Sequence, residues 1–210
     1  MKEKGGDFSV EERNLLSVAF KNLIGGKRTA IRTIGAIEQN PKYSKHGSAL
    51  GDYKKKIEEE LFKDCENIIK MIEVDAMKSV TDAEGKAFFQ KMIGDYYRYM
   101  AENAATERLN TARDGALKFY NEADTSAKDL PACNPIKLGL ALNFSVFHYE
   151  VMQDNKRACE LAEKALQEAM AKIDEIDEDQ FREAKSIIEL LKENLTLWKD
   201  EAGGNDVDDL

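Results

Sequence analysis

The chain has 210 residues, with 40 acidic and 31 basic side chains, a formal net charge of −9 and a pI near 5.0. This acidic balance excludes broad, sequence-independent binding to nucleic acids, and the lack of any run of about 18 apolar residues predicts no membrane span. The three cysteines, Cys65, Cys133 and Cys159, are too few and too widely spaced for a disulfide scaffold or a zinc site, which favours a reduced, cytoplasmic setting.

The composition predicts an all-α protein, because the chain has only three prolines and is rich in Ala, Glu, Lys and Leu. Ser9 and Glu12 have the spacing of a capping box, and the helix that they open ends at Asn40–Pro41. A second helix is predicted over residues 49–74. A third opens at the capping box of Thr81–Glu84 and continues to about residue 103.

The second half of the chain predicts four more helices, over 106–127, 136–152, 156–173 and 178–198. Asn134 suits the N-cap of the strongly apolar helix that begins beside Pro135. Seven helices with short connections predict an antiparallel array, with helix pairs like those of tetratricopeptide repeats. We therefore expect a leader over 1–8, one helical domain over 9–199, and a disordered acidic tail over 200–210.

Nothing in the residues supports an enzyme, a metal site or a cofactor. The sequence has no glycine-rich phosphate loop and no zinc-protease motif. His46 and His148 each stand without a second ligand at metal-binding spacing, so His148 is interpreted as a packed helical residue. The many carboxylates are interpreted as solvated helix faces.

Two predicted helices carry cationic faces. Lys21, Arg28 and Arg32 lie within about 20° of one line on the first helix. On the third helix, Arg98 lies among tyrosines, where partial desolvation would favour bidentate recognition of phosphate. The alternative is a solvated cationic stripe, with Lys91 and Asp95 forming an ordinary helical ion pair.

Two other helices carry an asparagine within a largely apolar or mixed face. Asn143 lies beside Val146 and Glu150, and Asn194 lies between Leu190 and Trp198. Each amide has two interpretations that spacing leaves open: a core amide satisfied by a neighbouring helix, or a groove amide that binds a peptide backbone. If the cationic and apolar faces opposed each other, they would form an amphipathic groove for a phosphorylated, extended peptide.

Four long segments carry a resemblance to a known family: Glu11 to Asn22, Gly94 to Tyr99, Pro135 to Phe147, and Leu190 to Trp198. The chain resembles the 14-3-3 proteins over about Ser9 to Trp198. The resemblance implies an all-α, cup-shaped fold that is usually dimeric. It also implies an adaptor that binds phosphoserine or phosphothreonine segments of client proteins, without catalysis and without a cofactor.

The resemblance assigns site residues by position. It places Lys21, Arg28, Arg98 and Tyr99 on the phosphate-binding positions, and such a set suits a dianion. The peptide-binding positions fall on Asn143 and Asn194, which would grip the client backbone, on the wall residues Leu142, Val146, Leu190 and Trp198, and on Lys91, Asp95 and Glu150.

The chain also departs from the family pattern. Family members begin with two helices before the segment that starts at Glu11, so we expect a weakened homodimer or heterodimer that retains Tyr53, Lys56 and Glu60 as a dimer-surface remnant. Ala30–Ile31 replaces a Ser-Trp pair that carries regulatory phosphorylation in some members. The acidic tail is expected to compete weakly with phosphopeptide for the groove.

Two rival interpretations remain at this point. In one, the chain is a structural or chaperone-like protein that binds exposed apolar surfaces regardless of phosphorylation. In the other, it is a shortened product that works only beside a full-length partner. Dependence of binding on phosphate, and heterodimer formation with a full-length relative, would distinguish these interpretations from the adaptor.

Overall fold

The computed structural model describes residues 7–204, with side chains described through residue 201. The regular secondary structure of this range is entirely helical, with no strand, which confirms the predicted all-α class. The seven long helices are α1 (Val10–Glu38), α2 (Gly47–Met71), α4 (Ala83–Ala101), α5 (Thr106–Ser126), α6 (Pro135–Glu150), α7 (Asn155–Met170) and α8 (Glu178–Gly204). A π-helical turn, Ile72–Ala76, and the three-residue α3, Met77–Ser79, extend α2. None of the described helices is long and apolar enough to cross a membrane.

The helix starts follow local capping chemistry. The Ser9–Glu12 capping box is present at the start of α1, with both reciprocal hydrogen bonds. At α4 the predicted cap was one residue off: the Asp82 carboxylate, not the Thr81 hydroxyl, accepts from the Gly85 N–H. The Thr81 hydroxyl instead donates to Asp7, which ties the segment before α1 to the start of α4.

Asn134 caps α6 as predicted. Its side-chain oxygen accepts from the backbone N–H groups of Ile136 and Lys137, at 2.9 and 3.2 Å, and Pro135 stands at the first helical position. At the other end of the chain, α8 continues six residues beyond Trp198, so residues 200–204 of the expected disordered tail are helical. The remainder of that expected tail, 205–210, lies outside the described residues.

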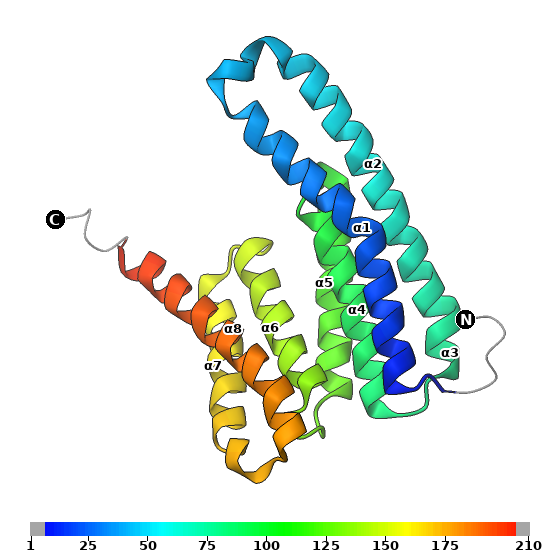
Figure 1. The fold of residues 1–210 in the computed structure, drawn as a ribbon, viewed down its shortest axis with the longest axis vertical. Coiled ribbons are helices and arrows are strands. Elements are labelled where there is room, and N and C mark those ends of the chain that lie inside the picture. The colour runs from blue at the N-terminus through cyan, green and yellow to red at the C-terminus, as the bar shows by residue number, and fades with distance from the viewer. Residues whose placement is uncertain (1–6, 205–210) are drawn as a thin grey trace.

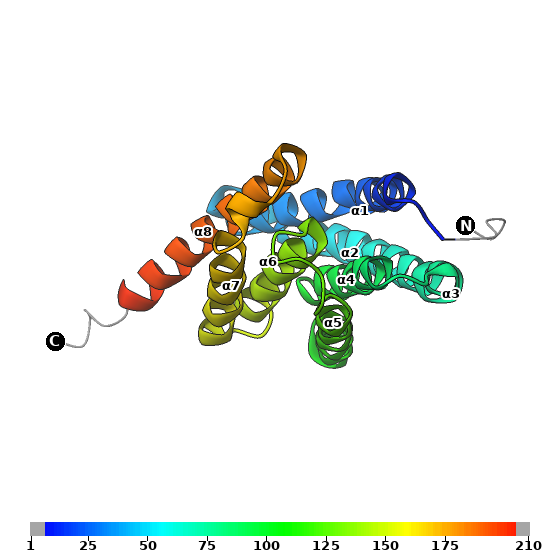
Figure 2. The same ribbon diagram turned by 90° about the horizontal axis from the view of Figure 1, so that it is seen from below.

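The helices form two groups that meet at α5 and α6. Figure 1 shows α1 and α2 as a long antiparallel hairpin packed on α4 and α5, with α6, α7 and α8 gathered beside them. Turned by 90°, the same fold has α1 and α8 on one face and α5 and α7 on the other (Figure 2). Helices far apart in the sequence therefore border the same face.

Three clusters of buried side chains hold this arrangement. The first joins α1, α2 and α4, and includes Ile24, Leu61 and Phe89. The second joins α6, α7 and α8, where Ala158 and Ala162 allow close helix approach. The third, which we call the seam cluster, joins α4, α5 and α6 and consists of Ala87, Ala116, Tyr120, Ala123, Ala127, Leu140, Phe144 and Phe147.

Candidate functional site

The cationic faces of α1 and α4 meet. The Arg28 guanidinium on α1 lies 2.9 Å from one oxygen of Glu102, and the Arg98 guanidinium on α4 lies 2.9 Å from the other. Arg32, one turn beyond Arg28, reaches the same carboxylate at 3.5 Å. Arg98 is only 7% exposed, so this charge is largely desolvated. From spacing alone, these two faces could have been solvated stripes. In the structure they form one cluster.

The ring of Tyr99 lies against both Arg28 and Arg98. The guanidinium carbon of Arg28 lies 3.9 Å from the centre of the Tyr99 ring, and that of Arg98 lies 4.7 Å from it. These are cation–π distances, and they hold both guanidinium groups beside the phenol. Burial and the charge of Asp95 raise the pKa of Tyr99 to about 12. The phenol therefore keeps its proton at neutral pH and can donate a hydrogen bond.

The buried carboxylate of Asp95 accepts hydrogen bonds from three side chains next to the cluster. It accepts from Lys91 at 2.9 Å, from the Asn143 amide at 2.8 Å and from the Tyr120 hydroxyl at 2.7 Å. Burial alone would raise the pKa of Asp95, but the charges of Lys91 and Arg98 outweigh it and lower that pKa. Asp95 is therefore ionised and joins α4, α5 and α6.

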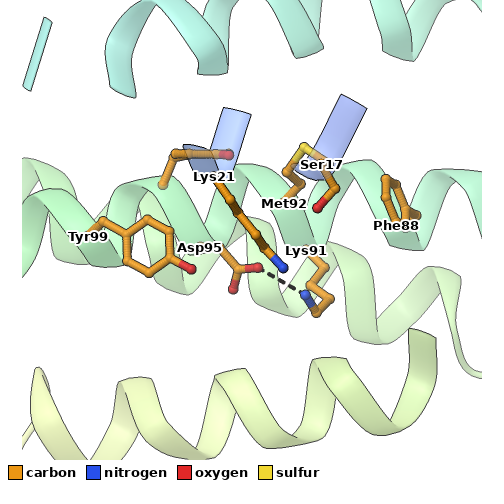
Figure 3. A pocket seen from close by; sticks show the side chains of 8 residues that line it. Ser17, Lys21, Phe88, Lys91, Met92, Asp95 and Tyr99 are labelled. Carbon is orange, nitrogen blue, oxygen red and sulfur yellow. Dashed lines mark hydrogen bonds and ion pairs between the residues drawn. The ribbon is translucent and has the colours of Figure 1, made fainter. Parts of the chain in front are cut away.

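A small pocket of about 20 Å³ opens between α1 and α4, next to this carboxylate. Figure 3 shows the Lys21 side chain reaching down from α1 toward the Lys91–Asp95 pair, with Tyr99 to one side and Phe88 to the other. Lys21 is exposed, and it makes no ion pair within the part of the chain that the structure describes. Its ammonium is consequently free to meet an anion.

A second pocket, of about 330 Å³, shares the side chain of Phe88 with the first. Four helices border it: Val10, Arg13 and Asn14 come from α1, Glu84 and Phe88 from α4, Pro135 and Ile136 from α6, and Glu183 and Ser186 from α8. We refer to these two pockets together as the groove, and their lining residues range from Lys21 and Tyr99 in the first to Glu183 and Ser186 of α8 in the second. The second pocket is lined by both charged and apolar side chains, and the opposition of a cationic and an apolar wall stays a prediction.

The remaining predicted peptide-binding residues are spread along α6 and α8. Leu142 and Val146 are half-buried against the cluster of α6, α7 and α8. Leu190 is 47% exposed and Asn194 is half-buried. Glu150 is exposed near the end of α6. Among the described residues, no hydrogen bond or ion pair joins these side chains to the cluster of Arg28, Arg98 and Tyr99.

Trp198 differs from the prediction. It was expected in the wall of the groove, but it is 3% exposed and stacks on Tyr149, with ring centres 4.9 Å apart. Its backbone carbonyl accepts from the Asn155 side chain. Trp198 therefore packs α8 against α6 and α7 instead of presenting its ring to a ligand.

Two members of the cluster were not predicted. Glu102 lies four residues after Arg98, so the helical i,i+4 rule was an available signal. Tyr120 lies on α5 in a segment without any site motif, and only the packing of three helices brings its hydroxyl to Asp95. The predicted dimer-surface residues Tyr53, Lys56 and Glu60 are exposed on α2, away from this cluster.

Comparisons with known proteins find similarity to one protein family. A family model described as 14-3-3 protein matches residues 1–199. The chain is 43% identical to 14-3-3 protein 2 of Entamoeba histolytica, over 97% of this chain and 87% of that protein. It is 42% identical to human 14-3-3 protein theta, over 98% of this chain and 85% of the relative. It is 46% identical to the 14-3-3-like protein of Fucus vesiculosus, over 94% and 79% of the two chains.

Proposed function

Because the chain belongs to the 14-3-3 family, whose members are phosphoserine- and phosphothreonine-binding adaptors and not enzymes, we propose that Arg28, Arg98 and Tyr99 hold the phosphate of its clients. The observation that carries this assignment is the convergence of two guanidinium groups, from α1 and α4, on one phenol ring. Guanidinium forks bind phosphate oxygens bidentately, and the phenol adds a donor. Lys21, which has no described counter-ion, adds a point charge.

The local charge balance supports a dianionic ligand. Five cations, Lys21, Arg28, Arg32, Lys91 and Arg98, surround two carboxylates, Asp95 and Glu102, which leaves a local charge of +3 in a chain of −9. A phosphoryl group brings a charge of about −2 at neutral pH. Glu102 holds Arg28 and Arg98 side by side before the client arrives, so little rearrangement is needed on binding.

We assign the client backbone to Asn143 and Asn194. The amide nitrogen of Asn143 already donates to Asp95, which leaves its amide oxygen to accept from a backbone N–H of an extended client. Asn194 is half-buried on α8. Leu142, Val146 and Leu190 would cover apolar client side chains, while Lys91 and Glu150 contribute charge along the groove.

Fluorescence anisotropy with a labelled, Arg-rich phosphoserine peptide tests this function. Wild type should bind the peptide, and its unphosphorylated twin should bind at least tenfold more weakly. Arg28→Ala should cost about ten- to hundredfold in affinity, because hydrogen bonds to charged groups contribute about 1.5–3 kcal/mol. Arg182→Ala removes an arginine that is 74% exposed on α8 and should leave affinity unchanged. Equal binding of both peptides would reject the phosphate site.

One observation favours a second candidate function. Leu15, Val18 and Leu23 on α1 are 72%, 54% and 52% exposed, which is unusual for three large apolar side chains on one helix. These side chains support chaperone-like binding to apolar surfaces without phosphate. The test is whether the chain suppresses the aggregation of an unfolded test protein. Suppression that Arg28→Ala leaves unchanged and Leu15→Ser reduces would establish this activity. Failure to suppress aggregation would reject it.

Members of the family dimerise, and we propose that this chain pairs only weakly through α2. Tyr53 is 58% exposed there, but its predicted partners on that face, Lys56 and Glu60, are charged. One aromatic ring between charges offers less apolar area than a stable interface needs. Sedimentation velocity over a range of concentrations should show a monomer at micromolar concentration, and a concentration-independent dimer would contradict the proposal. If the chain works beside a full-length relative, mixing the two should give a heterodimer by native mass spectrometry.

We further propose that the protein acts in the cytoplasm. The described cysteines Cys65, Cys133 and Cys159 are free thiols, and reducing conditions keep such thiols free. Fractionation of cells that express a tagged chain should recover it with cytoplasmic markers, and recovery in a secretory compartment would contradict the assignment.

A further inference from the structure

Tyr120 lies at the centre of the molecule, on a helix that does not border the groove. Its side chain is fully buried, and α5 contributes no residue to either groove pocket. The ring stacks on Phe144 of α6, with ring centres 5.2 Å apart, and lies against Phe147 at 5.6 Å. On its other side the ring fits against the backbone of α4 at Gly94, where an added Cβ would stand 2.8 Å from the ring. The ring is therefore held between α4 and α6.

The hydroxyl of this fixed ring connects two groups of the binding site. It accepts a hydrogen bond from Nε of Arg98 at 3.2 Å, and it donates one to Oδ1 of Asp95 at 2.7 Å. Arg98 uses a different atom, Nη1, to reach Glu102. Tyr120 therefore fixes one edge of the guanidinium while Glu102 fixes another. With both edges held, the plane of the Arg98 guanidinium is determined.

The second bond of the hydroxyl reaches the peptide-binding side. The same Asp95 oxygen that accepts from Tyr120 also accepts from the Asn143 amide, at 2.8 Å. The position of that oxygen sets the direction of the amide. One buried hydroxyl thus orients both the phosphate-binding arginine on α4 and the backbone-binding amide on α6.

We propose that Tyr120 is a positioning residue for client binding, which presents Arg98 and Asn143 in the geometry that a phosphorylated segment requires. This inference rests on the proposed function. It assigns part of the affinity to a residue that touches no client atom. Tyr120 acts through a defined hydrogen bond, so its effect is separable from a general loss of stability.

The first test is Tyr120→Phe, which keeps the ring and removes the hydroxyl. Affinity for the phosphopeptide should fall about fivefold, in line with the loss of one intramolecular hydrogen bond. Tyr97→Phe is the matched control: Tyr97 is a half-buried tyrosine beside Arg98 on α4, and its hydroxyl makes no described hydrogen bond. It should leave affinity unchanged. Equal affinity of wild type and Tyr120→Phe would overturn the inference.

A double-mutant cycle separates positioning from structure. Arg98→Lys keeps the charge but removes the Nε–H that Tyr120 accepts, so Tyr120→Phe should cost less than twofold in that background. If Tyr120 had only a structural role, Tyr120→Phe would lower the affinity by the same factor of about five with either arginine or lysine at position 98. That result would overturn the inference. Circular dichroism on each variant confirms that folded proteins are compared.

A measurement on the wild type covers the case in which Tyr120→Phe does not fold. In protein labelled with 15N-arginine, the Nε–H of Arg98 should exchange with water at least tenfold more slowly than that of the exposed Arg182. Equal exchange rates would refute the hydrogen bond. If wild type shows no phosphate-dependent binding, the proposed function fails; if wild type binds and the Tyr120 tests fail, only the positioning role fails.

Discussion

Two consecutive glycines, Gly25 and Gly26, lie in the middle of α1, between Lys21 and Arg28, for which we propose a role in phosphate binding. A Cβ added at either glycine meets no atom within 4 Å, and neither glycine has a positive φ. In such a helix interior, alanine is more favourable than glycine by about 0.8–1 kcal/mol per residue. We therefore expect the double variant Gly25→Ala/Gly26→Ala to be about 1.5–2 kcal/mol more stable than wild type.

Thermal unfolding followed by far-ultraviolet circular dichroism measures this gain. For a chain of this length, about 1 kcal/mol shifts the Tm by roughly 2–4 °C, so the double variant should melt about 3–8 °C higher. The contrasting variant is Gly94→Ala, whose Cβ would stand 2.8 Å from the ring of the buried Tyr120. Overpacking of this kind costs about 1–3 kcal/mol, which offsets or exceeds the gain in helix propensity.

The two variants together test the reasoning. If Gly25→Ala/Gly26→Ala leaves the Tm unchanged or lowers it, the space around these glycines is not free in solution. A stabilised Gly94→Ala would show that the ring of Tyr120 moves easily. The phosphopeptide affinity of the α1 variant should stay within twofold of wild type, because neither methyl group reaches a residue of the groove.

Three further predictions concern titration, thiol reactivity and capping. Burial lowers the pKa of His148 below its ordinary value of 6.5, and its Nδ1 has no described partner. The unfolded chain therefore binds this proton more readily, and stability present above pH 6.5 is lost as the pH falls below that value. In urea titrations at a series of pH values below 6.5, His148→Phe should flatten this loss. Burial raises the pKa of the Cys65 thiol to about 12. A thiol reagent should therefore modify the half-buried Cys159 in the folded chain, and Cys65 only after unfolding. Mass spectra that show early modification of Cys65 would contradict this. Asn134→Ala removes the α6 cap and should lower the free energy of unfolding by about 1 kcal/mol, whereas Asn134→Ser, which keeps an oxygen for the cap, should retain most of it.

The sequence predicted the helices well where local chemistry sets their limits. The Ser9 and Asn134 caps and the strongly apolar composition of α6 are properties of neighbouring residues, and each was recovered. The cap of α4 was misplaced by one residue because Thr81 and Asp82 both suit that position. The choice between them depends on Asp7, which is distant in sequence.

The grouping of the candidate site residues could be predicted where the family resemblance supplies it, and not where it depends on packing; whether this group binds phosphate stays a prediction. Lys21, Arg28, Arg98 and Tyr99 lie together as expected. Tyr120 was not predicted, because its hydrogen bonds form only when α5 packs against α4 and α6. Trp198 was misplaced because its helical spacing fits a groove wall and a core face equally well, and only its stacking on Tyr149 decides between them.

The seam cluster has a consequence for how client preference changes over evolution. The α1 side of the groove is anchored in one cluster and the α8 side in another, and the seam cluster of α4, α5 and α6 lies between them. Ala116 and Ala123 in this seam are fully buried. A larger side chain at either position would tilt one group of helices against the other and alter the width of the groove. Mutational drift at residues that no client touches can thereby change the range of client shapes that the groove accepts.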